Sequence, residues 1–210
     1  MPARICGNGG SAASRFTRRP TSGISRISGP PKLYLYKGRY YLFGSFSSPQ
    51  RSRGVSVLVS DRPDGGFRPL VNEAVTPEGW MCLDGTLYID KDGHPWLIYA
   101  RKWIEVMVGE VYAQRLSEDL IHTAEAPIFL FKGSDAERAE LITTGRRMGI
   151  VTNAPFIYTT DSDKLLLLWS SFRPNGEYVI GAAVSHTESL HGPCGSSSSR
   201  CTSSRKNLSS

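Results

Sequence analysis

The first 60 residues contain no Asp or Glu, although they carry ten Lys and Arg residues. Residues 189–210 also lack acids and add three basic residues, while residues 61–188 hold all 19 acids and twelve basic residues. The net charge of +6 therefore comes from the two ends, and the middle of the chain is acidic overall. A nucleic-acid-binding protein places its basic residues on a folded surface, often beside aromatic rings. This distribution instead predicts solvated basic arms and no nucleic-acid partner.

Other signals are also missing. No run approaches the roughly 18 apolar residues of a membrane span, so no membrane association is predicted. The N-terminus lacks the apolar segment of a secretory signal, which leaves the localisation open between cytoplasmic and secreted. The four cysteines have no metal-ligand spacing and the four histidines are scattered, so neither metal nor other cofactor is predicted. Cys82, in an apolar context, is expected to be a small buried residue.

Both ends of the chain are poor in apolar residues. Residues 1–28 are rich in Arg, Ser and Gly, and half of residues 195–210 are serine. Such segments bury too little apolar surface to offset the entropy lost on ordering them. We therefore predict a disordered basic N-terminal arm over 1–28, a folded domain over 29–193 and a disordered Ser-rich tail over 194–210.

What remains is a unit that occurs three times. Its first part reads "PKLYLYKGRYYLFGSF", "DGTLYIDKDGHPWLIYAR" and "APFIYTTDSDKLLLLWSS", and its second part "GVSVLVSD", "GEVYAQRLSED" and "GEYVIGAAVSH". Each copy predicts a strand, a tight turn, a second strand, a loop and a third strand that ends near a serine. The aromatic residue of the second strand and that serine are 17, 18 and 16 residues apart in the three copies.

The turns and the repeat length indicate the fold class. Lys37-Gly38, Asp92-Gly93 and the segment 161–163 supply residues that accept left-handed backbone or cap a hairpin. Helical patterning is nearly absent, and only "GSDAERAELI" (133–142) is expected to form one or two helical turns. Repeats worth about four strands each are typical of propeller blades. We predict an all-β fold, an incomplete β-propeller with about three blades whose open edges favour self-association.

Propellers bind ligands at the central channel, near the start of each blade's first strand. The residues at those starts are Lys32, Asp84 and Asn153. An isolated Asp-Gly pair such as Asp84-Gly85 is ordinarily a turn. The repeat position of Asp84 favours a functional role, because equivalent positions of a propeller converge on one axis.

The segments "CLDGTLYIDKDGHPWLIYARKW", "GEVYAQRLSEDL" and "VTNAPFIYTTDSDKLLLLWSSFRPNGEYVIGAAVSHTESLHGP" resemble the five-bladed propeller glycosidases of family 43. That family includes arabinanases, arabinofuranosidases and β-xylosidases, and "GPPKLYLYKGRYYLFGSFSS" resembles its second-blade segment. The resemblance covers about residues 29–193. It implies inverting hydrolysis by three carboxylates, with the acid and the base about 6.5–9.5 Å apart. It also implies an oligo- or polysaccharide ligand and, in some relatives, a calcium ion in the channel.

The resemblance assigns these roles unevenly. Asp84 matches the Asp that tunes the pKa of the acid, and Asn153 falls in the slot of the general acid. An amide has no acidic proton to donate. The base would come from a blade before residue 29, where this chain has no carboxylate. Lys32 stands where an acid is expected.

Three further residues are candidates for binding sugar: Trp80, Trp103 and Arg101. The two indole rings are potential stacking platforms, whereas Arg101 and Lys102 stand where relatives often carry His and an acidic residue. A solvated loop is the alternative for both cations. Trp169, inside "LLLLW", is expected in the core, and His94 on a surface hairpin. "DKDG" resembles a calcium loop only loosely and fits a hairpin better.

Two functions follow. The first is a glycoside hydrolase-like domain for arabinose- or xylose-containing polysaccharide, truncated or frameshifted, and inactive or impaired because base and acid are missing. The alternative is a non-catalytic carbohydrate-binding or scaffolding propeller. The sequence does not separate arabinose from xylose, or endo from exo action.

Overall fold

A computed structural model of the chain describes residues 26–48, 51–136, 141–144, 147–173, 175–185 and 189–190. Residues 1–25 of the predicted arm and the whole predicted tail lie outside these residues, so their disorder stays a prediction. The first strand begins at Arg26, three residues before the predicted domain start.

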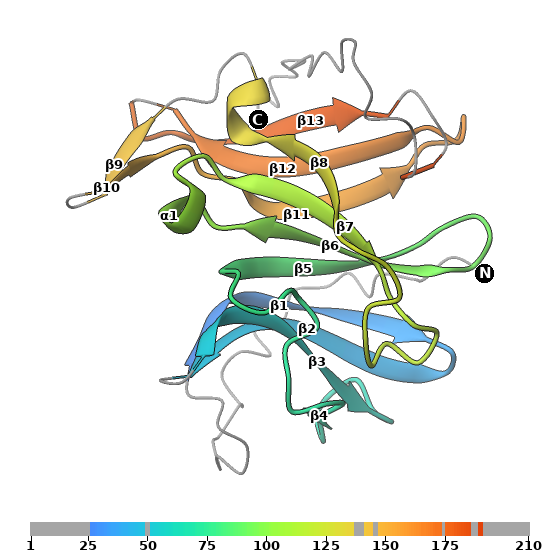
Figure 1. The fold of residues 1–210 in the computed structure, drawn as a ribbon. Helices are drawn as coiled ribbons and strands as arrows, with labels where there is room; N and C mark the ends of the chain where they lie inside the picture. The colour runs from blue at the N-terminus through green and yellow to red at the C-terminus, as the bar shows by residue number, and fades with distance from the viewer. Residues whose placement is uncertain are drawn as a thin grey trace. The chain divides into compact units, whose positions relative to one another are not determined.

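Strands make up nearly all of the regular structure (Figure 1). They are β1 (Arg26–Tyr36), β2 (Arg39–Ser48), β3 (Arg51–Ser60), β4 (Arg68–Pro69), β5 (Cys82–Ile89), β6 (Pro95–Arg101), β7 (Glu110–Arg115), β8 (Ile128–Lys132), β9 (Ile142–Thr144), β10 (Arg147–Gly149), β11 (Asn153–Thr159), β12 (Leu165–Phe172) and β13 (Tyr178–Val184). The described helical segments are α1 (Trp103–Val106) and a 3-10 turn, η2 (Gly133–Asp135). That turn begins the segment predicted as helical, of which residues 137–140 are not described.

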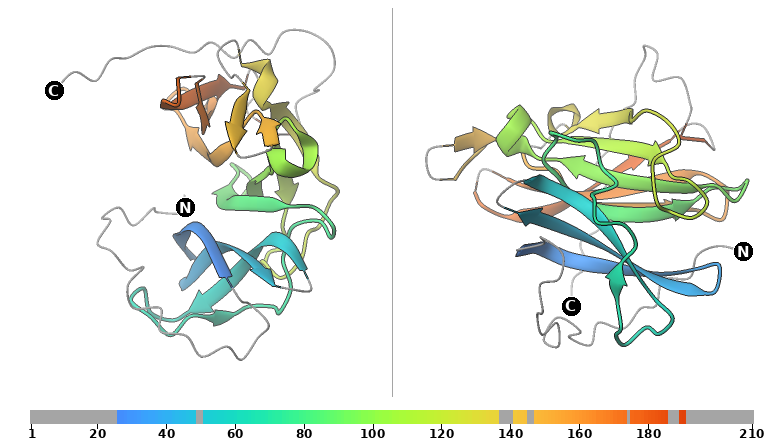
Figure 2. Two further views of the ribbon diagram at one scale, coloured as in Figure 1. Left: turned by 90° about the vertical axis from the view of Figure 1, so that its left-hand side faces the viewer. Right: turned by 60° about the horizontal axis from the view of Figure 1, so that its bottom comes forward.

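The strands form three blade-like sheets and one short ribbon. The first sheet has the order β1-β2-β3-β4, the second β5-β6-β7-β8 and the third β11-β12-β13, while β9 and β10 pair separately. The three copies of the sequence unit correspond to these three sheets. Figure 2 shows their strands from two further sides.

The chain divides into two compact units. One comprises Met1–Tyr99 and Ala113–Pro127, and the other Ala100–Tyr112 and Ile128–Ser210. The first sheet belongs wholly to the first unit and the third sheet to the second, whereas the second sheet contains residues of both.

Both faces of the first sheet are buried. Phe43 is 1% exposed and meets Tyr34 edge-on, with ring centroids 5.6 Å apart. On the opposite face, Leu42, Phe46 and Leu58 form a buried cluster. Because side chains alternate across a strand, the apolar run in β2 supplies both faces.

The third sheet is buried on one face only. Leu165, Leu167 and Trp169 of β12 are buried, and the residues between them are partly exposed. Trp169 packs against Phe131, with ring centroids 5.2 Å apart. Its predicted place in the core is confirmed, as is that of Cys82, which is fully buried.

The three predicted hairpin turns are confirmed. Lys37, Gly38, Gly93 and Asp163 all have the positive φ angles that tight hairpins require. Asp90 closes the β5–β6 turn through backbone hydrogen bonds with Gly93 and His94, and Thr160 closes the β11–β12 turn in the same way.

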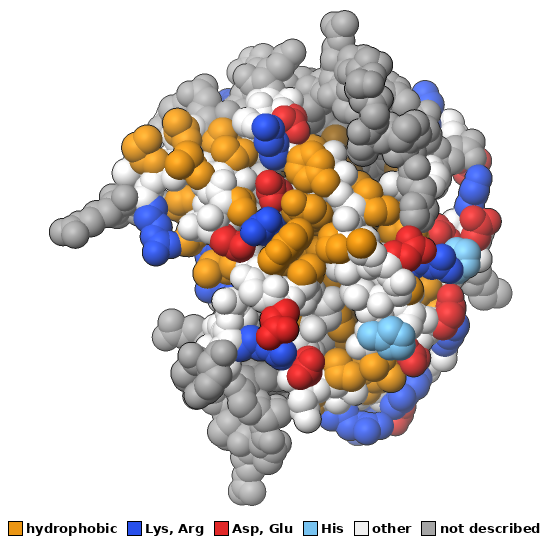
Figure 3. Space-filling view, in the orientation of Figure 1, with side chains coloured by type: hydrophobic (Ala, Val, Ile, Leu, Met, Phe, Trp, Pro, Cys, Tyr) orange, Lys and Arg blue, Asp and Glu red, His pale blue; other side chains and the backbone are white. Residues whose placement is uncertain are grey.

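Within the described residues, no helix has the length and apolar character needed to cross a membrane. On the face drawn in Figure 3, acidic and basic side chains are interspersed, without a broad area of positive charge.

Candidate functional site

Asp84 lies near the start of β5, in a left-handed conformation with φ 57°. Its backbone N–H donates to Ser45 Oγ of β2, at 2.9 Å. A Cβ atom on Gly29 would lie 3.0 Å from Asp84 Oδ1, so the backbone of β1 passes close to the carboxylate. Two strands of the first sheet therefore hold this aspartate in a conformation that residues with a side chain seldom adopt.

The glycine after Asp84 is required by packing. A Cβ atom on Gly85 would lie 3.0 Å from Val55 Cγ2 and 3.1 Å from Leu97 Cδ1. The backbone of β5 thus comes into close contact with the core at this point. The Asp-Gly pair belongs to a strand start and is not a turn.

Lys32 of β1 is the cation beside Asp84. Its Nζ donates to the carbonyl oxygen of Asp84 at 3.3 Å and to the hydroxyl of Thr86. Asp84 and Thr86 are two residues apart on β5, so they point to the same face of the strand. Lys32, Asp84 and Thr86 form one polar cluster, which we call the Asp84 cluster.

Burial lowers the pKa of Lys32 to about 8, and the negative charge of Asp84 opposes this shift. Burial also raises the pKa of Tyr34 to about 12, against the hydrogen bonds with Thr86 and Leu87. At neutral pH the cluster therefore contains an ammonium next to its carboxylate. Such a pair disfavours a cation such as calcium at this position.

The starts of the first strands of the first and third sheets share an irregularity. The β1–β2 pairing shifts register between Ser28 and Lys32, and the β11–β12 pairing shifts between Asn153 and Phe156. A bulge redirects the side chains next to it and is common beside active sites. The three repeat positions singled out in the sequence thus lie at irregular or left-handed strand starts.

Asn153 belongs to the second unit. Its carbonyl oxygen accepts a hydrogen bond from Ser170 Oγ at 3.2 Å, and Ala154 after it has a φ of 49°. The preceding Thr152 is buried and donates to the carbonyl oxygen of Glu110 at 3.5 Å. The segment is therefore anchored on both sides of the asparagine.

Arg101, also in the second unit, is surrounded by acids. Its guanidinium lies 2.5 Å from Glu105 Oε1 and 3.6 Å from Glu110 Oε2. Tyr112 donates to Glu110 at 2.9 Å. The hydrogen bond with Glu105 is the main cause of a raised Arg101 pKa, and burial opposes it. Two carboxylates thus balance the charge of Arg101, whose role in substrate binding stays a prediction.

The two candidate tryptophans differ in burial. Trp103 is 8% exposed, and its ring packs against Gly149, where a Cβ atom would overlap the indole. Trp80 is partly exposed, and its backbone N–H donates to the carbonyl oxygen of Pro77 at 3.3 Å. The exposure of Trp80 fits a stacking platform better than the burial of Trp103, although neither role is tested.

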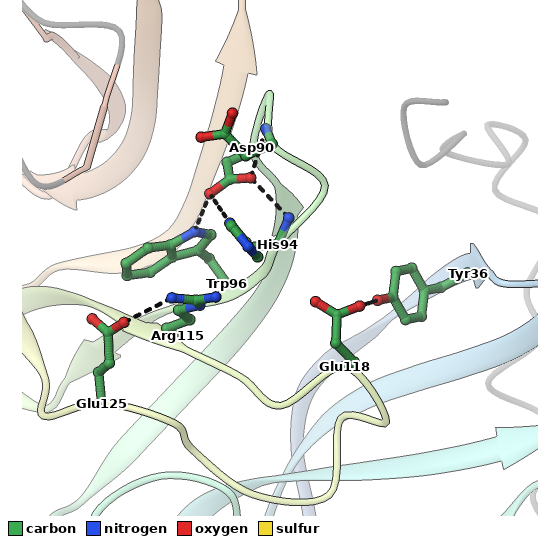
Figure 4. A network of polar contacts seen from close by, with 8 residues as sticks. Tyr36, Asp90, His94, Trp96, Arg115, Glu118 and Glu125 are labelled. Atoms are coloured by element: carbon green, nitrogen blue, oxygen red, sulfur yellow. Dashed lines mark hydrogen bonds and ion pairs between the residues drawn. The ribbon is translucent and has the colours of Figure 1, made fainter.

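Asp90, Asp92 and His94 bring ligand atoms within 4.8 Å of one another (Figure 4). The Asp90 carboxylate already accepts hydrogen bonds from the indole of Trp96 at 2.9 Å and from the backbone of His94 at 2.8 Å. These contacts fit the predicted hairpin, and they occupy the oxygens that a metal ion would need.

The structure brings Asp84 together with Lys32, Thr86 and Ser45 in the first unit. Sequence reasoning missed Thr86 and Ser45. The two-residue period of a strand points to Thr86, since it places that residue beside Asp84. Ser45 lies 39 residues away in the chain, and no local pattern connects it to Asp84. Trp80 falls in the first unit, and Arg101, Trp103 and Asn153 in the second.

Comparisons with known proteins place these features in a family. The profile of glycosyl hydrolases family 43 matches residues 13–208. The crystal structure of an endo-arabinase from Bacteroides thetaiotaomicron VPI-5482 is 51% identical with a TM-score of 0.81, over 85% of this chain and 63% of that one. A thermostable family-43 glycoside hydrolase, 19% identical over 82% of this chain and 54% of that one, has the same fold with a TM-score of 0.65.

A curated relative is the extracellular endo-α-(1→5)-L-arabinanase 1 of Bacillus subtilis (strain 168). It is 31% identical over 77 residues, which are 35% of this chain and 24% of that protein. The chain thus spans less than two thirds of the endo-arabinase and about a quarter of the arabinanase. The predicted fold class, an incomplete five-bladed propeller with about three blades, is confirmed. Its sequence and its blade-like sheets together show that the chain belongs to glycosyl hydrolases family 43.

Proposed function

We propose that this chain recognises arabinan and that its own capacity to hydrolyse arabinan is impaired. Two relatives at least 30% identical are an endo-arabinase and an endo-arabinanase, which favours arabinan over xylan as the ligand. The contribution of this chain to recognition is assigned to the Asp84 cluster and the partly exposed Trp80.

One observation carries the proposed impairment: the neutral Asn153 at the start of β11. Inverting hydrolysis needs one carboxylic acid to protonate the leaving oxygen and one carboxylate to activate water. The named neighbours of Asp84 are an ammonium, two hydroxyls and a glycine. A carboxylate next to Lys32 at neutral pH is held in its ionised form, which suits an electrostatic role and not proton donation.

Binding and turnover are tested separately. Calorimetric titration with linear arabino-oligosaccharides is expected to give heat, with weaker binding or none for xylo-oligosaccharides. Release of reducing ends from arabinan is expected to stay at background. Asp84→Asn is expected to weaken binding, while Asp92→Asn, on an exposed hairpin position, serves as the matched control.

Each result decides one part of the proposal. Absence of heat with every arabino-oligosaccharide would overturn arabinan recognition. Robust turnover that Asp84→Asn abolishes would overturn the impairment and assign Asp84 to an active enzyme.

The notebook of alternatives reduces to one second candidate, a carbohydrate-binding propeller without catalysis. The observation that favours it is the retention of Asp84 in a well-held conformation beside Lys32, although a charged pair does not suit general acid chemistry. Binding by the wild type that survives in Asp84→Asn, with no turnover in either, would favour this candidate.

A further inference from the structure

The two faces of the third sheet are both apolar, but only one is covered. Register pairs place Tyr158, Leu166 and Val184 in one cross-strand row and Phe156, Leu168 and Ala182 in the next. All six side chains lie on the face opposite to Leu165, Leu167 and Trp169. We call this surface the exposed face of the third sheet.

The exposure on this face is large for apolar residues. Ile180 is 76% exposed, Tyr178 55%, Tyr158 51% and Val184 41%. Isolated exposed apolar residues are ordinary, whereas a contiguous set across three neighbouring strands marks an interaction surface. All three strands belong to the second unit and are labelled in Figure 1.

The chemistry of the face favours another sheet over a sugar. Its hydroxyl groups are already engaged, because Ser170 Oγ and Tyr178 Oη form a hydrogen bond of 2.5 Å. The rest of the surface is aliphatic and aromatic. A sugar site needs polar groups that fix the orientation of the ligand, and this face offers few.

The face also lacks devices that keep copies apart. Natural sheets prevent association with charged residues and prolines in their outermost strands. The segment Tyr178–Val184 reads "YVIGAAV" and contains neither. Although the chain carries a net charge of +6, no charge on these strands would repel the same face of another molecule.

We propose that the exposed face of the third sheet is a self-association surface, and that it binds the same face of a second copy around a twofold axis. Twofold dimers use one patch on both subunits, so the patch must be complementary to itself. A flat, uncharged apolar sheet face meets this condition, since two sheets pack face to face about 10 Å apart.

The size of the face sets the expected strength. Three strands of seven residues cover roughly 350 Å² in projection, from the spacing and rise of β-strands. A standard interface buries about 800 Å² per partner, so this surface supports a weak, reversible dimer and not an obligate one. Association is therefore expected to depend on protein concentration.

Sedimentation velocity of the full chain tests the proposal, over protein concentrations from about 1 to 100 µM. The wild type is expected to shift from monomer toward dimer. Ile180→Glu is expected to weaken association by about tenfold or more, because it buries a charge at the centre of the contact. Met148→Glu, at a 57% exposed apolar residue of β10, is the matched control and should associate like the wild type.

A second variant separates face packing from simple pairing along β13. Tyr158→Glu changes the same face on β11, and it is also expected to weaken association by about tenfold. Circular dichroism and thermal unfolding confirm that each variant folds like the wild type.

Three outcomes would overturn the proposal. The wild type could remain monomeric over the whole range, Met148→Glu could weaken association as much as Ile180→Glu, or species larger than a dimer could grow with concentration. Loss of association in Ile180→Glu but not in Tyr158→Glu would assign the contact to the edge of β13 and would also overturn it.

Discussion

The first and third sheets are built from the same sequence unit but differ in burial. In the first sheet both faces of β2 are covered, with Phe43 and Phe46 almost fully buried on opposite sides. In the third sheet only the side of Trp169 is covered, although β12 reads as an almost continuous apolar run. An apolar run of this kind is typical of strands buried on both faces. The comparison teaches that the sequence of a blade states how many faces it can bury, and its neighbours decide how many it does.

The largest effects should come from truncating core aromatics. Phe43→Ala and Phe46→Ala should each lower the free energy of unfolding by about 3–5 kcal/mol, because both leave cavities. In the third sheet Trp169→Ala should cost about as much. Tyr178→Ala should cost less than about 1 kcal/mol, since its ring is already half exposed. Urea unfolding measures all four, and a Tyr178→Ala cost equal to that of Trp169→Ala would contradict one-sided burial.

Lys32 and Asn153 occupy equivalent starts of the first and third units, but only Lys32 titrates. Its pKa is lowered from 10.5 to about 8 in the folded state, so the unfolded chain holds this proton more strongly. Stability should therefore rise as the pH increases from about 8 to 10.5, by an amount on the order of 1–3 kcal/mol.

Chemical unfolding of the wild type and of Lys32→Met across this pH range measures the effect. The rise should disappear in Lys32→Met and persist in Asn153→Ala. A parallel pH dependence in Lys32→Met would show that other groups cause it.

Gly85 tests how closely β5 approaches its neighbours. Gly85→Ala should cost about 2 kcal/mol, because the added methyl group meets Val55 and Leu97 in a packed core. Gly65→Ala, where no atom lies within 4 Å of the new Cβ, should change stability by less than about 0.5 kcal/mol. Thermal unfolding compares the two, and equal shifts would contradict the close approach.

The smallest expected effect compares two hairpins. Asp90 and Thr160 both hold a backbone N–H four residues on, but only Asp90 also binds a buried indole, that of Trp96. Asp90→Ala should cost about 1–2 kcal/mol by leaving that N–H without a partner, and Thr160→Ala less than about 1 kcal/mol. Urea unfolding at neutral pH should resolve this order.

The same hairpin has a pH dependence. Burial acts to raise the pKa of Asp90, but the hydrogen bonds from Trp96 and His94 outweigh it and the net shift is downward. The stabilisation is therefore present above the ordinary carboxyl pKa and is lost as the pH falls through the lowered value. Asp90→Ala should remove this part of the acid sensitivity, and an unchanged acid limb in the variant would contradict the assignment.

Much of the fold could be predicted from local patterns. The turn residues Lys37-Gly38 and Asp92-Gly93 identified hairpins, because few residues accept left-handed backbone. The repeat identified three sheets. What local patterns did not supply were contacts across long sequence separations, such as Glu118 with Tyr36, 82 residues apart.

The candidate site was predicted only in part. The repeat position singled out Asp84, but its left-handed backbone depends on Ser45 and on the close approach of Gly85 to the core, which are tertiary contacts. Trp103 was expected on a loop and is instead 8% exposed in α1, because Gly149 leaves room for its ring. Burial by a distant glycine has no signal in the sequence around Trp103.

The thiol of Cys82, fully buried two residues before Asp84, has a practical consequence. A thiol reagent can reach it only when β5 opens, so its labelling rate reports the lifetime of the closed site without any introduced probe. Peptide mass spectrometry separates this signal from the chain's other three cysteines. Protection by an arabino-oligosaccharide would then measure ligand binding directly at the strand that carries the aspartate.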